Sequence, residues 1–209
     1  MRRRLDEEPR FAEVSDVERG FSVMREKFAA VRHVHLLGGE PLLNGDCEAC
    51  LNFGSDLLLR HDGKIQQQGA AFWQACRETR TMIDMTWYPV MSAEAKDAVE
   101  QKCREAGVVL RVTKVERFMD KFCETGTEDA AASYRACRRS QYCPYLRNGR
   151  LYPCATASHL ADRLPQQERE EGIDVRSHSA SEILRYLLTP VSACRFCAAT
   201  PGESEWSRA

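Results

Sequence analysis

The chain has 209 residues with 30 Lys and Arg against 31 Asp and Glu, a net charge of −1, which argues against a polyanion partner or a membrane surface. No apolar run reaches the roughly 20 residues of a membrane helix, and the N-terminus lacks the apolar stretch of a signal peptide. We therefore expect a cytoplasmic protein, without nucleic-acid or membrane partners, that forms one large domain or two small ones.

Residues 1–120 predict helices that alternate with strands. A capping box from Ser15 to Glu18 begins the first helix. Its apolar stripe consists of Val17, Phe21, Met24 and Phe28. Gly107 is the expected C-cap of the last helix in this part. The expected elements are a helix at 15–30, strands at 33–37 and 56–63, a helix at 69–80, a strand at 81–89, a helix at 92–107 and a strand at 108–113. Such alternation predicts an α/β fold with a parallel sheet.

The alternation stops near residue 120, where we place the boundary between an α/β part (1–120) and a cysteine-rich part (121–209). Residues 124–136 are typical of a loop, and so is the charged stretch 163–179. Ser179 and Glu182 cap a last helix that ends before Pro190. The tail after Cys197 is polar, and we expect it to fray.

A β-hairpin is expected around Asn148-Gly149, a strong signal for a two-residue turn. Counting outward from the turn pairs Arg147 with Arg150, Leu146 with Leu151, Tyr145 with Tyr152 and finally Cys143 with Cys154. The two leucines share the face that can enter a core. The two cysteines share the other face, with Cβ atoms roughly 4.5–5.5 Å apart.

The cysteines of this part indicate a metal site. Ten cysteines in a reducing compartment favour metal over disulfides. The candidate ligands are Cys137, Cys143, Cys154, Cys194 and Cys197, of which the last two form a CxxC pair. Four thiolates in two pairs suit either zinc or an iron–sulfur cluster, and the spacing does not choose between them. The other interpretation is a set of buried thiols without metal, which is what we expect of Cys76, Cys103 and Cys123.

The order of motifs resembles that of a known enzyme family. A strand ends in Gly38-Gly39-Glu40-Pro41, and the segment Cys137-x11-Gly149-x4-Cys154 and the CxxC pair follow. This order resembles the radical S-adenosylmethionine (SAM) enzymes, in particular those with a C-terminal auxiliary-cluster domain of the SPASM or twitch type. The resemblance implies a partial (β/α) barrel, incomplete at the N-terminus. A small cysteine-rich domain of hairpin and helix, with an auxiliary [4Fe–4S] cluster, would follow it.

The resemblance also implies a SAM site at Gly38, Gly39, Glu40 and Pro41, whose backbone would hold the amino group of the methionine. Glycines suit this role because a β-carbon would obstruct the approach, and parallel sheets bind ligands at the carboxyl ends of strands. The other interpretation is an ordinary glycine turn with a solvated Glu40. Further side chains expected near this rim are those of His61, Asp62, Asp84 and Thr86, with Arg111 as a partner for the SAM carboxylate, although strand residues of these types more often face solvent.

One motif of that family is missing. Its members carry CxxxCxxC before the first helix, and those thiolates hold the cluster that cleaves SAM. This sequence contains no CxxxCxxC, and Cys47 and Cys50 offer only two ligands, after the first strand. We therefore expect either a truncated record of an active enzyme or a degenerate relative.

Three functions follow as hypotheses. The first is SAM-dependent radical modification of a peptide or small molecule, aided by an electron-donor protein, with this chain incomplete for catalysis. The second is a non-catalytic iron–sulfur or zinc module that acts as a scaffold or substrate-binding partner. The third is a zinc-ribbon-like structural protein with no link to SAM.

Overall fold

The computed structural model describes residues 11–31, 34–37, 41–54, 57–61, 65, 68–137, 143–160, 164 and 171–205. The chain divides into two compact units, each described by itself below. The first, here the α/β unit, consists mainly of residues 30–118, and the second, the cysteine-rich unit, mainly of residues 119–204. Helix α1 (Val14–Lys27) is divided between them after Phe21. No helix in the described part of the chain is both long and apolar enough to cross a bilayer.

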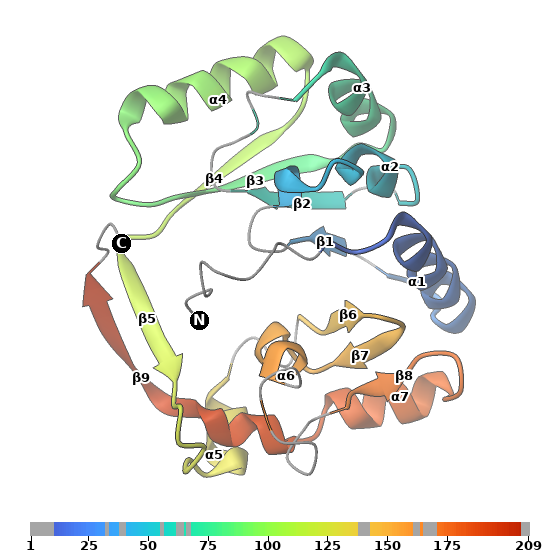
Figure 1. Ribbon diagram of the computed structural model, residues 1–209, viewed down its shortest axis with the longest axis vertical. Helices are drawn as coiled ribbons and strands as arrows, with labels where there is room; N and C mark the ends of the chain where they lie inside the picture. The colour runs from blue at the N-terminus through green and yellow to red at the C-terminus, as the bar shows by residue number, and fades with distance from the viewer. Residues whose placement is uncertain are drawn as a thin grey trace. The chain divides into compact units, whose positions relative to one another are not determined.

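The α/β unit is built on a parallel sheet of four strands that lie in chain order (Figure 1). The strands are β1 (Val34–Leu36), β2 (Leu57–His61), β3 (Met82–Trp87) and β4 (Leu110–Lys114). Between them lie η1 (Pro41–Leu43), α2 (Cys47–Leu51), α3 (Ala70–Glu78) and α4 (Ala93–Ala106). Because each strand is followed by helix and then by a parallel neighbour, the predicted α/β class is confirmed.

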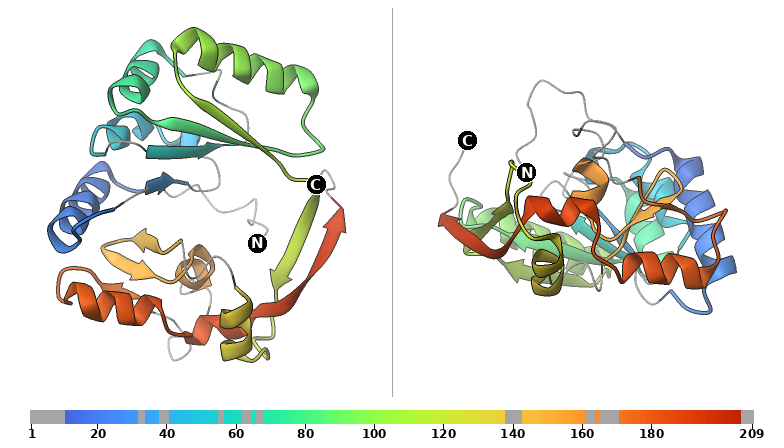
Figure 2. Two further views of the ribbon diagram at one scale, coloured as in Figure 1. Left: turned by 180° about the vertical axis from the view of Figure 1, so that it is seen from behind. Right: turned by 90° about the horizontal axis from the view of Figure 1, so that it is seen from below.

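The sheet has one apolar and one polar face. Ile83 and Met85 pack with helix residues such as Phe72 and Val99 in a single core, and α3 and α4 lie along this side (Figures 1 and 2). Because side chains alternate along a strand, Asp84, which lies between Ile83 and Met85, belongs to the opposite face. The helix-covered face thus supplies the core.

Local signals explain the boundaries of α4. Ser92 caps its first turn by accepting a hydrogen bond from the Ala95 amide at 3.2 Å. Gly107 ends it in the left-handed conformation, with φ of 69°, as predicted. The predicted capping box at Ser15 is wrong, because α1 begins at Val14 and Ser15 already lies within it.

The cysteine-rich unit contains two small sheets. Strands β6 (Tyr145–Arg147), β7 (Arg150–Tyr152) and β8 (Ile173–Asp174) form one antiparallel sheet, and β5 (Arg117–Phe122) pairs with β9 (Cys197–Glu205) in the other (Figure 2). Its helices are α5 (Ala130–Ala136), α6 (Ala155–Leu160), α7 (Ala180–Leu187) and the 3-10 helix η4 (Ser192–Phe196). The capping box of Ser179 and Glu182 at the start of α7 is confirmed.

The predicted hairpin is present in its predicted register. Asn148 and Gly149 both have positive φ, of 50° and 73°, as a type I′ turn requires. The ladder extends only to Tyr145 and Tyr152, so the expected pair of Cys143 and Cys154 lies beyond it. Leu151 packs among Ile173, Val175, Ile183 and Leu187, whereas Leu146 is exposed, so only one of the two leucines enters a core.

Two predictions about irregular structure are wrong. Residues 130–136 form helix α5 and not a loop, because Asp129 caps an alanine-rich turn and its Oδ1 accepts from the Ala132 amide at 2.7 Å. The tail after Cys197 does not fray up to Glu205 but forms strand β9 beside β5. Neither strand has the apolar alternation that sequence patterns detect.

Candidate metal centre

The five candidate ligands of the cysteine-rich unit lie at the ends of its elements. Cys137 follows α5, Cys154 precedes α6, Cys194 lies within η4 and Cys197 begins β9. These four thiols are partly shielded from solvent, whereas Cys143, before β6, is exposed. Burial therefore separates Cys143 from the other four.

Electrostatic coupling shows which thiols are neighbours. Burial, first, and then repulsion from Cys154, Cys137 and Cys194, in that order, raise the pKa of Cys197 to about 11. Thiolates repel one another in this way where they lie near one another in a poorly solvated place. The thiols that act on Cys197 come from three parts of the chain: Cys137, Cys154 and the CxxC pair to which Cys194 and Cys197 belong.

Cys154 also takes part in the capping of a helix. Burial raises the pKa of its thiol, an effect opposed by a hydrogen bond from the Ala157 amide and reinforced by repulsion from Cys137. The Ala157 N–H donates to Sγ at 3.4 Å, so the sulfur caps the first turn of α6. A donor aimed at sulfur favours the thiolate, which is the form that binds metal.

Two residues of α5 line the group. Burial, followed by repulsion from Cys194 and Cys137, raises the pKa of Tyr134, whose hydroxyl donates to the Leu187 carbonyl at 3.2 Å. Ser133 donates its hydroxyl to the carbonyl of Cys197. A small core completes the surroundings, and it contains Tyr152, Ala157, Leu160, Val191, Ala193 and Phe196. The helix that the sequence did not predict therefore forms one wall of the candidate site.

The four thiols are not arranged as the ligands of one metal ion. Among the described residues, no group of three or more His, Cys, Asp or Glu side chains is arranged to hold a metal ion. The mutual repulsion marks proximity, and binding would require side-chain rotation to bring the sulfurs to one centre. Such rotation is local, since η4 contacts both α5 and α6.

Residues predicted for a SAM site are placed only in part. Gly38, Gly39 and Glu40 lie outside the described residues, and so do Asp62 and Gly63, whereas Pro41 begins η1. Asp84 and Arg111 face each other on neighbouring strands, with bonds from Nε to Oδ1 at 3.0 Å and from Nη2 to Oδ2 at 2.8 Å. Asp84 and Thr86 are buried, so the expectation that they face solvent is wrong.

The remaining cysteines belong mostly to the core of the α/β unit. Cys47, Cys76 and Cys103, from three successive helices, are buried in it, which confirms the packing role predicted for Cys76 and Cys103. The same prediction for Cys123 is wrong, because this residue is only partly buried, outside the core, and its thiol contacts the Thr125 hydroxyl at 3.0 Å. This hydrogen bond, followed by those around Thr127, lowers its pKa.

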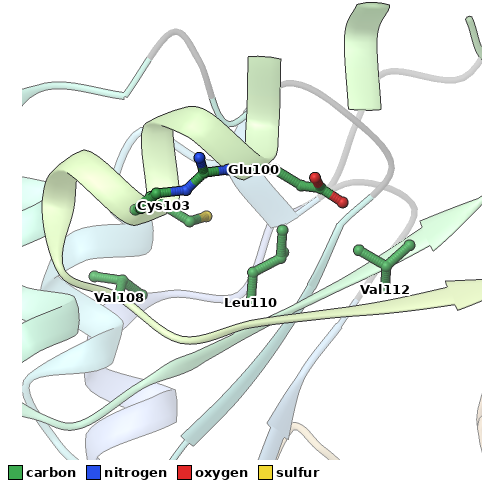
Figure 3. A pocket seen from close by; sticks show the side chains of 6 residues that line it. Glu100, Cys103, Val108, Leu110 and Val112 are labelled. Atoms are coloured by element: carbon green, nitrogen blue, oxygen red, sulfur yellow. The ribbon is translucent and has the colours of Figure 1, made fainter. Parts of the chain in front are cut away.

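A pocket of about 330 Å³ lies between α4 and the edge strand β4 (Figure 3). It is lined by Glu100, Cys103, Arg104, Val108, Leu110 and Val112. Apolar side chains form its base and one buried thiol lies among them, while none of the predicted ligands is present. The pocket is therefore separate from the candidate metal centre.

We expect the stability of the cysteine-rich unit to depend on Gly126, which lies against the ring of Phe196, the residue before Cys197. Its φ is +61°, and an added Cβ would lie 2.5 and 2.6 Å from two carbons of the Phe196 ring. Gly126→Ala should therefore lower the free energy of unfolding by about 2 kcal/mol or more, from left-handed strain and overpacking. Urea denaturation checks this, with Gly202→Ala as the control because a Cβ there meets nothing within 4 Å. Equal stability of the two variants would contradict the expectation.

Comparison of the chain with family models, with curated proteins and with solved structures finds no match to any of them.

Proposed function

We propose that the protein is an iron–sulfur protein whose cysteine-rich unit holds one [4Fe–4S] cluster on Cys137, Cys154, Cys194 and Cys197. The observation that carries this proposal is the coupling of three of these thiols to the fourth. Two single cysteines and one CxxC pair, from three separate parts of the chain, form a donor set that suits a metal ion or cluster. Cys143, which is exposed, is not needed as a ligand.

A cluster is the occupant that the surroundings favour. A small apolar core and a capped sulfur lie beside the thiols, and a cluster is held by four thiolates whose potential responds to burial and to hydrogen bonds on sulfur. Zinc remains the second candidate, since a tetrahedral all-cysteine zinc site has the same donor set. Thiols with raised pKa values hold their protons more tightly. Iron or zinc must therefore displace these protons when it binds.

A wider proposal concerns the α/β unit. Its four parallel strands, with helices on one face, support a partial (β/α) barrel of the radical SAM type. In that proposal the partial barrel binds SAM at Gly38–Pro41. The cysteine-rich unit serves a peptide or small-molecule substrate or accepts electrons from a donor protein. The given sequence contains no CxxxCxxC, so the part of such chemistry that we propose for its residues is cluster binding and substrate docking.

The test is the metal content of three proteins after anaerobic purification and cluster reconstitution. We expect about four irons and four sulfides in the wild type and in Cys143→Ala, and a loss of at least half of both in Cys154→Ala. Cys143→Ala is the matched control because it also removes one cysteine from the unit. Equal loss in both variants would overturn the ligand set, and one zinc with no iron would replace the cluster by a structural zinc site.

A further inference from the structure

Ser158, in α6, has a buried hydroxyl group that the fold does not use. The residue is 0% exposed, and its Oγ has no hydrogen-bond partner among the described residues. A buried hydroxyl without a partner costs free energy, because it has lost its bonds to water and gained none. Such a group in a native fold calls for a physical explanation.

Ser158 lies one helical turn after Cys154. The two residues are four apart, and the Ser158 amide donates to the Cys154 carbonyl at 3.3 Å. Residues at this spacing share a helix face, and side chains lean toward the N-terminus of the helix. Ser158 therefore lies over the turn that Cys154 begins. Arg147 fixes this turn by donating from Nη1 to the Ser158 carbonyl at 3.0 Å.

We propose that Ser158 is a positioning residue of the metal centre, whose hydroxyl donates a hydrogen bond to a sulfur atom on the Cys154 side when the centre is bound. This inference rests on the proposed function, since it requires thiolate or sulfide as the acceptor. Together with the Ala157 amide, it would supply Cys154 with two donors, one from the backbone and one from a side chain. Donors of this kind orient metal ligands and tune their affinity and potential.

A pair of matched variants tests the metal-free protein first. Ser158 and Ser133 are both buried serines beside the thiols, but only Ser133 has a protein acceptor, the Cys197 carbonyl. Ser133→Ala should lower the thermal midpoint of the metal-free protein, because it removes a made bond. Ser158→Ala should leave that midpoint unchanged or raise it, because it removes a polar atom with no partner. A fall equal to that of Ser133→Ala would overturn the proposal.

The loaded protein gives the second readout. For a cluster, Ser158→Ala should make the reduction potential more negative, since a hydrogen bond to sulfur stabilises the reduced, more negative form. A tenfold change in the redox equilibrium corresponds to about 59 mV for one electron. For zinc, competition with a chelator should show affinity lower by about tenfold. A wild type without metal would overturn the proposed function, whereas a loaded Ser158→Ala identical to wild type would overturn this inference alone.

Discussion

Replacing Arg111 by alanine should destabilise the α/β unit by about 2 kcal/mol, because the buried carboxylate of Asp84 loses two charge-assisted hydrogen bonds. Asp84 is fully buried while the Arg111 side chain is 48% exposed, so the variant removes the more exposed partner and leaves the carboxylate buried in the sheet. The two bonds of the guanidinium fork are lost together. Urea denaturation at pH 7, followed by the fluorescence of the buried Trp73, measures the effect.

Two further variants show whether the loss of stability comes from the paired hydrogen bonds of the guanidinium group or from its charge. Arg111→Lys keeps the charge but not the fork, and should cost an intermediate amount. Thr113→Val removes only the longer bond to Asp84, at 3.4 Å, and should cost less than about 1 kcal/mol. If Arg111→Ala also costs less than about 1 kcal/mol, the stability of the fold does not depend on the pairing of Asp84 with Arg111.

The α/β unit could be predicted well because its signals are local. Ser92 and Gly107 mark the ends of α4, and the apolar runs of β1 to β4 each lie between helices. The alternation of side chains along a strand predicts which face of the sheet each residue lies on. It does not predict that Asp84 is buried. That burial depends on a partner 27 residues away, and an isolated aspartate in a strand gives no sign of it.

The candidate site could be predicted as a set of residues but not as a geometry. The CxxC spacing gave Cys194 and Cys197 as candidates, the Asn148-Gly149 turn gave Cys143 and Cys154, and Cys137 was added from its place before Cys143. The predicted hairpin register is confirmed, but the observed ladder ends at Tyr145 and Tyr152, two positions before the predicted pair of Cys143 and Cys154. Helix α5 and strand β9, which support Cys137 and Cys197, went unnoticed because their apolar signals are weak and β9 pairs with a strand far away in the sequence.

The α/β unit should lose stability steeply in alkaline solution because of Cys76. Burial, and then repulsion from Cys47 and Cys103, raise the pKa of its thiol from 9.0 to about 12. The folded state therefore holds the proton more tightly than the unfolded state does. This contribution is fully present below pH 9 and is lost as the pH rises toward 12. Its full size is about 4 kcal/mol at 1.36 kcal/mol per pKa unit.

Urea denaturation under reducing conditions at pH 7.5 and 10.5 measures this loss. Cys76→Ala should be somewhat less stable than wild type at pH 7.5, because it leaves a small cavity, and should lose less stability on going to pH 10.5. Cys143→Ala is the control, since its exposed thiol should leave the wild-type pH dependence unchanged. Burial also raises the pKa of Cys103 to about 11, so part of the decline should persist in Cys76→Ala. A decline as large as that of wild type would mean that Cys76 ionises without cost to the fold.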